Sequence, residues 1–227
     1  MKPLLKGEDI KRYSQPVNQS YIFYPHIIDA KGKTNPIDEK TLIEKYPLAY
    51  QYISNFKNYL IDKKIKYKTN PTCWYSLHRA REKRIFESDK LITPQLQNHP
   101  SFAYDTMKCY PDAGGYSLIP IKEHNENLFY YYSILNSKLF YYFITSTSTA
   151  FNNNYYYFKT AYIEPFRFPY ASDSVINEIK TIVRKILDSK QESVTISTKE
   201  NEEHIDQLVY KLYNLTPEEI AIVEGKA

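Results

Sequence analysis

A chain of 227 residues, 42% of them hydrophobic, is long enough for one large domain or for a domain with a small helical appendage. No stretch approaches 18 consecutive apolar residues and the N-terminus lacks an apolar signal core, which argues against a membrane-spanning or secreted protein. Two cysteines, Cys73 and Cys109, have neither metal-ligand nor redox spacing. We therefore expect a soluble, cytoplasmic protein without a metal site.

The net charge of +4 is unevenly distributed along the chain. Residues 1–90 carry 18 Lys and Arg against 10 Asp and Glu, whereas residues 171–227 carry 7 against 11. Binding responds to local potential, so the basic N-terminal part favours a polyanionic partner. A lysine-rich solvated surface gives the same composition, and charge alone leaves both interpretations open.

The N-terminal third of the chain predicts short strands followed by helices. Strand or turn character covers residues 3–13 and 20–24, and residues 29–36 indicate a loop. Residues 38–64 predict a helical stretch in which Pro47 begins a second helix.

A four-residue repeat in this stretch predicts one apolar face, formed by Leu48, Tyr52, Phe56 and Leu60. Lysines gather at its far end, where the helix macrodipole also favours cations.

The middle of the chain predicts strands at residues 116–121 and 155–163, a helix over 127–143 and a polar loop over 145–154. Three helices are expected after it. The first is indicated by Asp173 as a cap before a 3.6-residue apolar repeat, and the second by the apolar residues of 205–212. The third is indicated by a capping box at 216–219 and ends at Gly225. A polar, mobile segment is expected over 189–202. Together these elements predict a mixed α/β fold: a twisted mixed or antiparallel sheet with helices on one side, followed by a helical C-terminal section.

The most informative stretch is residues 73–94, which places the single tryptophan, Trp74, beside a tight set of cations. Flat rings next to forked guanidinium groups suit a polyanion that offers both charge and base edges. This composition indicates a nucleic acid as the partner.

The sequence offers no catalytic set. Its five histidines are scattered, and its five glycines form no phosphate-binding loop. A nuclease-type metal site opened by Asp112 would need a carboxylate two residues before Lys122, where Pro120 stands. We expect a binding module that is not itself an enzyme and that binds no cofactor.

Four stretches in order resemble the C-terminal target-recognition, or specificity, domain of type IIG restriction–modification enzymes, which is related to the specificity subunits of type I systems. They are Leu5–Tyr13 (Leu-Lys-Gly-Glu-Asp-Ile-Lys-Arg-Tyr), Trp74–Pro94, Tyr132–Leu139 with its Leu-Asn-Ser sequence, and Ile205–Ile220. Each is weak alone, but the ordered set spans nearly the whole chain.

The resemblance implies a DNA-reading domain whose chemistry is done elsewhere. In the family, a methyltransferase, often with a nuclease, precedes this domain and extrudes the target adenine while the specificity domain reads base edges from the major groove. Because Met1 stands almost directly before the first motif, we expect an excised or separately encoded domain. S-adenosylmethionine and Mg²⁺ are then expected only on the missing catalytic part.

Roles in DNA binding follow from side-chain chemistry. Base reading is assigned to Arg79, Arg81, Arg84, Asn152, Asn153 and Asn154. Phosphate binding is assigned to Lys63, Lys64, Lys66, Lys68, Lys83, Arg12 and Lys159. Trp74 is expected to be a buried structural anchor. Salt-bridged surface arginines and a disordered polar asparagine loop are the alternative interpretations.

We divide the chain into a DNA target-recognition domain over 1–170 and a helical spacer over 171–227. The apolar repeat Ile179–Ile186 either docks on the catalytic part, as in the family, or packs on its own domain. Two alternatives to a complete DNA-recognition module stay open: a protein-interaction or assembly module with an incidental basic face, and one half of a type I specificity subunit.

Overall fold

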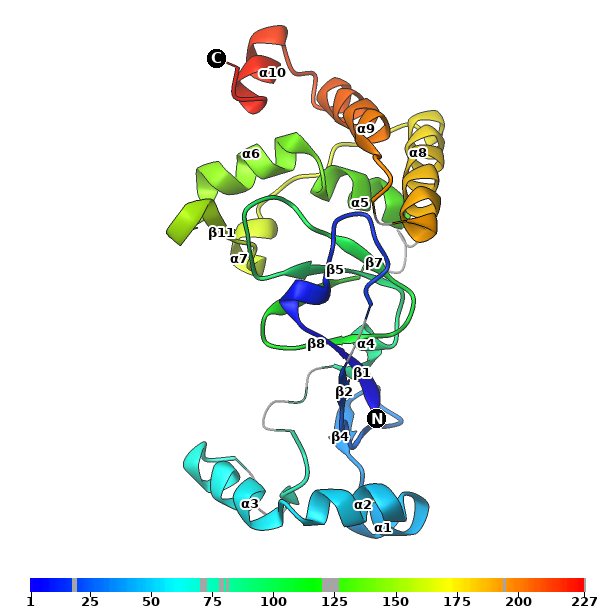
Figure 1. The fold of residues 1–227 in the computed structure, drawn as a ribbon, viewed down its shortest axis with the longest axis vertical. Helices are drawn as coiled ribbons and strands as arrows, with labels where there is room; N and C mark the ends of the chain where they lie inside the picture. The colour runs from blue at the N-terminus through cyan, green and yellow to red at the C-terminus, as the bar shows by residue number, and fades with distance from the viewer. Residues whose placement is uncertain are drawn as a thin grey trace. The chain divides into compact units, whose positions relative to one another are not determined.

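The computed structural model describes residues 1–17, 20–69, 73–77, 80, 82–119, 127–193 and 195–226, without the side chain of Asn153. The chain forms two compact units (Figure 1). The small unit comprises Met1–Lys2 and Tyr21–Glu87, and the large unit comprises Pro3–Ser20 and Ser88–Ala227. The fold is mixed α/β with several small sheets and a C-terminal helical section, which confirms the predicted class.

The part of the small unit from Tyr21 onward starts within β2 (Ser20–Ile22) and continues into an antiparallel hairpin of β3 (His26–Ile28) and β4 (Thr34–Pro36). The prediction of a loop over 29–36 was therefore wrong at its end. Asp29 closes the turn, because its carboxylate accepts the backbone amides of Lys31 and Lys33 at 2.9 and 2.8 Å.

Helices α1 (Glu39–Lys45), α2 (Pro47–Ser54), α3 (Lys57–Lys66) and α4 (Lys83–Phe86) complete this unit. Asp38 caps α1 by accepting from the amide of Thr41 at 2.8 Å, and Pro47 begins α2 as predicted.

The apolar face predicted along these helices was wrong at three of its four residues. Leu48, Tyr52 and Phe56 are 80%, 61% and 44% exposed, whereas Leu60 packs against the small core. In that core Leu42, Trp74 and Tyr75 are buried, and Tyr50, Ile53 and Ile61 are among their partly buried neighbours. Both sides of α2 are apolar, so its periodicity did not determine which side Trp74 would cover.

In the described part of the large unit, the strands form three small groups. Strand β5 (Lys90–Pro94) lies antiparallel between β7 (Ala103–Asp105) and β9 (Gly115–Leu118). Strand β1 (Lys2–Leu5) pairs in parallel with β8 (Tyr110–Pro111). After β1, the 3-10 turn η1 (Gly7–Asp9) leads into the segment that reaches Tyr13. Strand β11 (Tyr155–Tyr157) pairs antiparallel with both β6 (Leu96–Gln97) and β10 (Ala150–Phe151).

The helix predicted over 127–143 is two helices, α5 (Leu128–Leu135) and α6 (Lys138–Thr147). The helix breaks because Ser137 caps α6 and the side chain of Asn136 points inward. That side chain accepts a hydrogen bond from the amide of Phe102 at 3.0 Å and donates one to the Phe102 carbonyl at 3.3 Å. The strand predicted over 155–163 is a strand only at its start, in β11, because Thr160–Ile163 forms the short helix α7.

Helices α8 (Asp173–Glu192), α9 (Lys199–Leu212) and α10 (Pro217–Val223) form the C-terminal section, in which α8 and α9 pack side by side (Figure 1). The predicted capping box of α10 is confirmed, with Thr216 and Glu219 bonding each other's backbone amides. The predicted polar segment 189–202 is shorter than expected, because α8 and α9 extend into it from both ends.

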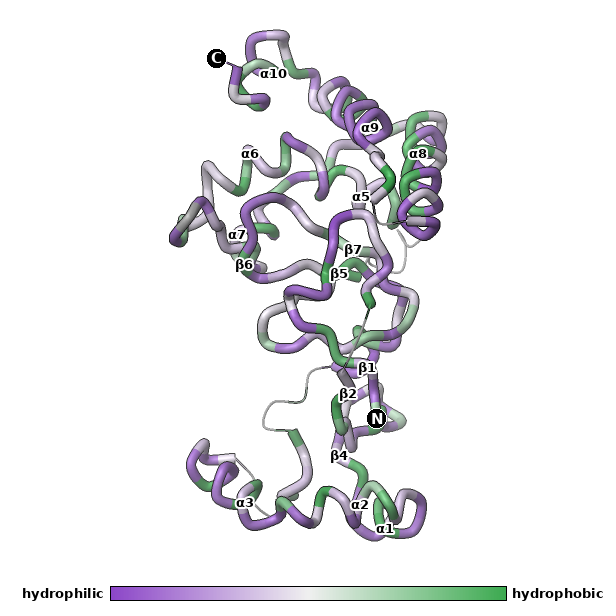
Figure 2. The backbone as a smooth tube through the Cα atoms, in the orientation of Figure 1, coloured by the Kyte–Doolittle hydropathy of each residue, from purple (hydrophilic) through white to green (hydrophobic). Residues whose placement is uncertain are grey.

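The apolar stripe of α8 belongs to the core of its own unit. Ile179, Val183 and Ile186 are fully buried in one cluster with residues such as Tyr132 on α5 and Val209 on α9. Figure 2 shows hydrophobic and hydrophilic residues alternating along the turns of α8, as this one-sided burial requires. The stripe is therefore not available for docking, and the boundary at residue 170 lies inside one compact unit. Within the described residues, none of the helices has both the length and the apolar composition needed to cross a membrane.

Candidate nucleic-acid interface

The C-terminal end of α3 presents three of the predicted phosphate-binding lysines to solvent. Lys63, Lys66 and Lys68 are exposed, and none forms an ion pair with another described residue. The ammonium of Lys63 lies 5.8 Å from the ring centre of Tyr59, and that of Lys66 lies 5.8 Å from that of Tyr67. This end of α3 thus combines cations with phenolic rings, which suits a phosphate backbone.

Lys64 lies on the opposite side of the helix and corrects the prediction for that residue. It is buried, and its ammonium donates to Ser76 Oγ at 2.7 Å and to the carbonyl of Leu77 at 3.3 Å. Burial lowers the pKa of Lys64. A side chain held inside the unit cannot reach a phosphate, so Lys64 fixes the segment after Trp74 instead.

Trp74 is 3% exposed and anchors that segment to the helices. Its Nε1 donates to Glu39 Oε1 at 3.0 Å, and the hydroxyl of Tyr50 donates to the same oxygen at 2.9 Å. The neighbouring Tyr75 hydroxyl donates to the carbonyl of Ile37 at 2.7 Å. One carboxylate on α1 therefore joins α2 to the tryptophan segment.

The arginine block is described only in part. Arg79 and Arg81 lie outside the described residues, and Arg84 is exposed on α4. Lys83 is half-buried: its ammonium donates to the carbonyl of His26 at 3.2 Å, and its backbone amide donates to Thr34 Oγ1 at 2.8 Å. Lys83 thus ties α4 to the β3–β4 hairpin, which limits its use as a phosphate contact.

In the large unit, the predicted asparagines occupy the turn of a hairpin. Strands β10 and β11 enclose a 3-10 turn, η4 (Asn152–Asn154), in which Asn152 and Asn154 are exposed. Phe151 and Tyr155 flank the turn and are 49% and 38% exposed. Sequence reasoning missed these two rings, although their position beside three asparagines was visible in the sequence.

Lys159 follows this hairpin at its root. Its ammonium lies 4.0 Å from the ring centre of Tyr157, and the side chain is half-buried. A cation over an aromatic face keeps its charge and part of its hydration, so Lys159 can still attract an anion.

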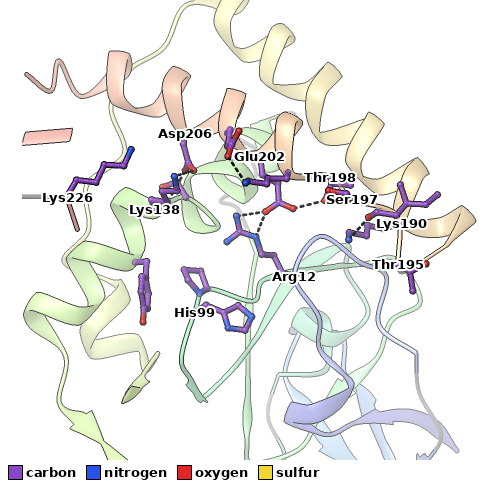
Figure 3. A pocket seen from close by; sticks show the side chains of 16 residues that line it. Arg12, His99, Lys138, Lys190, Thr195, Ser197, Thr198, Glu202, Asp206 and Lys226 are labelled. Carbon is purple, nitrogen blue, oxygen red and sulfur yellow. Dashed lines mark hydrogen bonds and ion pairs between the residues drawn. The ribbon is translucent and has the colours of Figure 1, made fainter. Parts of the chain in front are cut away.

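Arg12 is the second correction among the phosphate candidates. Its Nε and one terminal nitrogen both donate to Glu202 Oε2 at 2.7 Å, joining the segment after η1 to α9 (Figure 3). The two side chains are 25% and 23% exposed. Because this guanidinium is paired with a carboxylate of the same unit, Arg12 stabilises the large unit and is not placed to contact DNA phosphates.

This ion pair borders a polar pocket of about 760 Å³ between α6, α9 and the loops before them (Figure 3). Asp206 lies in its wall, 3% exposed, and accepts the backbone amide of Lys138 at 2.9 Å. Burial raises the pKa of Asp206 to about 6 despite the opposing effects of that hydrogen bond, Lys138 and Arg12. The pocket is lined by five cationic side chains and three carboxylates: Arg12, Lys138, Lys190, Lys199 and Lys226 against Glu202, Glu203 and Asp206.

Hydrogen bonds hold the polar side chains of the pocket wall. His99 bonds Asn98 Oδ1 through Nδ1 at 2.7 Å, and Thr198 donates to Glu202 at 2.6 Å. Across the described residues, no three His, Cys, Asp or Glu side chains come together as metal ligands would. Two contacts in the pocket wall join other parts of this unit to α9: Arg12 bonds Glu202, and the amide of Lys138 bonds Asp206.

Residues from three of the four family-like stretches line this pocket: Arg12 from the first, Ser137 and Lys138 from the third and Asp206 from the fourth. The ring centres of Tyr13 and Tyr132 are 5.1 Å apart in the adjacent core. In the second stretch, Lys90 forms a fully buried ion pair with Asp105 at 2.5 Å, in register between β5 and β7. The resemblance therefore rests largely on residues that build the scaffold.

A family model, the TaqI-like C-terminal specificity domain, matches residues 2–169. The chain belongs to this family. The match includes both units up to the residues just before α8, and it confirms the resemblance to a restriction–modification specificity domain. Membership implies that this TaqI-like specificity domain takes part in DNA target recognition within a restriction–modification enzyme.

Proposed function

We propose that the chain recognises a specific double-stranded DNA sequence and directs adenine methylation, cleavage or both by a catalytic part that these residues do not include. The observation that carries this proposal is the family match over residues 2–169. Exposed cations on the small unit and exposed amides on the large unit supply the two kinds of contact that recognition needs.

Lys63, Lys66 and Lys68 are proposed to contact phosphates, together with Lys159. Each phosphate neutralised on duplex DNA contributes about 0.9 to the slope of log affinity against log salt concentration. These contacts fix the position of the protein and carry no sequence information themselves.

Base reading is proposed for Arg79, Arg81, Arg84 and the asparagines of η4. The arginine fork matches the two acceptors of guanine, and an asparagine amide matches adenine, each good pair giving roughly 1–3 kcal/mol of discrimination. Catalysis, S-adenosylmethionine and Mg²⁺ would all belong to the catalytic part, a methyltransferase with or without a nuclease. The chain then serves either a type IIG enzyme or, as one half of a specificity subunit, a type I system.

The proposal is tested by selecting duplexes from a randomised library with the 227-residue chain and measuring the salt dependence of binding. We expect a single short consensus and a slope that falls in magnitude by about 2.7 when Lys63, Lys66 and Lys68 are all changed to alanine. A matched control removes the same charge from the C-terminal helices, at Arg184, Lys185 and Lys211. No consensus after repeated selection would reject the proposal.

One observation favours a protein-interaction module as a second candidate. The residues from Tyr46 to Phe56 carry no charge, and the exposed Leu48, Tyr52 and Phe56 give α2 and the turn after it an apolar surface that cannot bind phosphate. The catalytic part is the partner that this surface would meet. Retention of full DNA affinity by the triple lysine variant would favour this interpretation.

A further inference from the structure

The hairpin of β10 and β11 is held firmly at its root. Strand β11 pairs with β6, and the amide of the fully buried Phe158 donates to the carbonyl of Gln95 at 2.8 Å. The amide of Tyr157 donates to Ser148 Oγ at 3.1 Å. A turn supported in this way is presented in a defined orientation.

The two faces of the hairpin differ. Tyr156 packs against the core, with its ring centre 6.4 Å from that of Tyr141. Phe151 and Tyr155 stand directly opposite each other in the register, so their side chains share the other face. Phe151 also packs edge-on against Tyr157 at 5.9 Å, which makes this outer face an aromatic row.

The turn beyond this row is polar but uncharged. The side-chain amides of Asn152 and Asn154 are exposed and make no hydrogen bond to any other described residue. Asn154 adopts the left-handed conformation, with φ at 60°. No residue between Lys138 and Lys159 carries a charge. Phosphates are bound mainly by cations, so an uncharged tip of amides and rings suits base edges better.

We propose that this hairpin enters the major groove and reads an A·T base pair, with Asn152 or Asn154 on adenine and Phe151 against the thymine methyl group. The groove, about 12 Å wide, admits a two-stranded ribbon. An asparagine amide pairs with adenine N6 and N7, and phenylalanine is a common contact of the thymine methyl. Lys159, at the root of the hairpin, then contacts the phosphate backbone.

This inference rests on the proposed function and is tested with base analogues. A duplex consensus is first selected with the 227-residue chain. Each thymine is then replaced in turn by uracil, which lacks the methyl group, and each adenine by 7-deazaadenine, which lacks the N7 acceptor. Affinities are measured for the unaltered chain and for Phe151→Ala, Asn152→Ala and Asn154→Ala. Tyr170→Ala, which removes a ring that is 94% exposed in the same unit, is the control.

For the unaltered chain we expect one thymine whose replacement by uracil weakens binding about fourfold, the factor for burying one methyl group. The Phe151→Ala chain should bind the thymine and uracil duplexes equally. One asparagine variant should lose its sensitivity to 7-deazaadenine at the partner adenine. Tyr170→Ala should behave as the unaltered chain.

Specific binding in which no thymine or adenine replacement affects the unaltered chain would overturn the inference and leave the proposed function intact. Equal sensitivity of the unaltered and Phe151→Ala chains would overturn it in the same way and would assign the aromatic row to a protein contact. Failure to select any consensus would reject the proposed function, and the inference with it.

Discussion

His26 is a histidine that the small unit keeps neutral. It is 2% exposed, its Nδ1 has no hydrogen-bond partner among the described residues, and its ring lies 4.8 Å from that of Tyr24. Burial, reinforced by the nearby Lys64 and Lys83, lowers the pKa of His26 from 6.5 to about 4.

This shift predicts that the small unit loses stability on acidification. Between pH 6.5 and 4 the unfolded chain binds a proton that the folded chain rejects, so the free energy of unfolding falls by roughly 2–3 kcal/mol as pH decreases through this window. His26→Phe keeps the ring without the titration and should remove this fall. Trp74 is the single tryptophan and lies in this unit, so its fluorescence during urea unfolding measures the effect. An unchanged pH profile in His26→Phe would contradict the assignment.

The raised pKa of Asp206, in the large unit, predicts that its contribution to stability depends on pH in the opposite direction. Its pKa is raised from 3.8 to about 6 in the folded chain, so the stability that protonation provides is complete below pH 3.8 and is lost as pH rises through 6. Asp206→Asn keeps an oxygen for the amide of Lys138 but carries no charge. Relative to the unaltered chain, its free energy of unfolding should rise by roughly 2–2.5 kcal/mol between pH 4 and 7. Urea unfolding followed by circular dichroism measures this difference, and a difference independent of pH would refute the prediction.

At the scale of elements, α3 has a buried side, which holds Lys64, and a solvent-exposed side, which holds Lys66. Lys64→Ala leaves Ser76 Oγ and the carbonyl of Leu77 without their donor and should lower stability by about 1–3 kcal/mol. Lys66→Ala changes an exposed residue and should leave stability within about 0.5 kcal/mol, while reducing the salt slope of DNA binding by about 0.9. Trp74 fluorescence and DNA titrations on the same pair of variants compare both effects. Equal stability of the two variants would show that Lys64 is not an anchor.

Element types were predicted well where a local signal was strong. Pro47 and the Thr216–Glu219 capping box fixed helix starts, and the apolar repeat of α8 identified its buried face. Other features depended on distant contacts. The break between α5 and α6 exists because Asn136 bonds Phe102, and the exposed face of α2 is set by the side on which Trp74 docks. Neither partner is local in sequence, so periodicity could not find them.

The candidate site shows the same limit. Residue type suggested Arg12 and Lys64 as phosphate contacts, but a carboxylate 190 residues away holds Arg12, and the partly buried hydroxyl of Ser76 holds Lys64. Conversely, Phe151 and Tyr155 lie on one face only because of the cross-strand register, which pairs them directly. Charge and amide chemistry can be read from sequence, whereas access to solvent depends on the fold.

At the scale of the whole molecule, the parts that carry the family resemblance and the parts proposed to touch DNA are largely distinct. Arg12, Asn136, Asp206 and the Lys90–Asp105 pair hold the scaffold together. The end of α3 and the β10–β11 hairpin project side chains to solvent. The resemblance therefore identifies the class of protein without revealing the base sequence that it reads.

Discrimination between DNA sequences is the central claim, and equilibrium affinity tests it most directly. The 227-residue chain would be titrated at one fixed salt concentration with the selected duplex, with every single-base-pair change in it and with a scrambled duplex of the same composition. We predict that the selected duplex binds at least tenfold more tightly than the scrambled one, and that changes at read positions each cost about 1–3 kcal/mol. Equal affinity for all these duplexes would contradict the account.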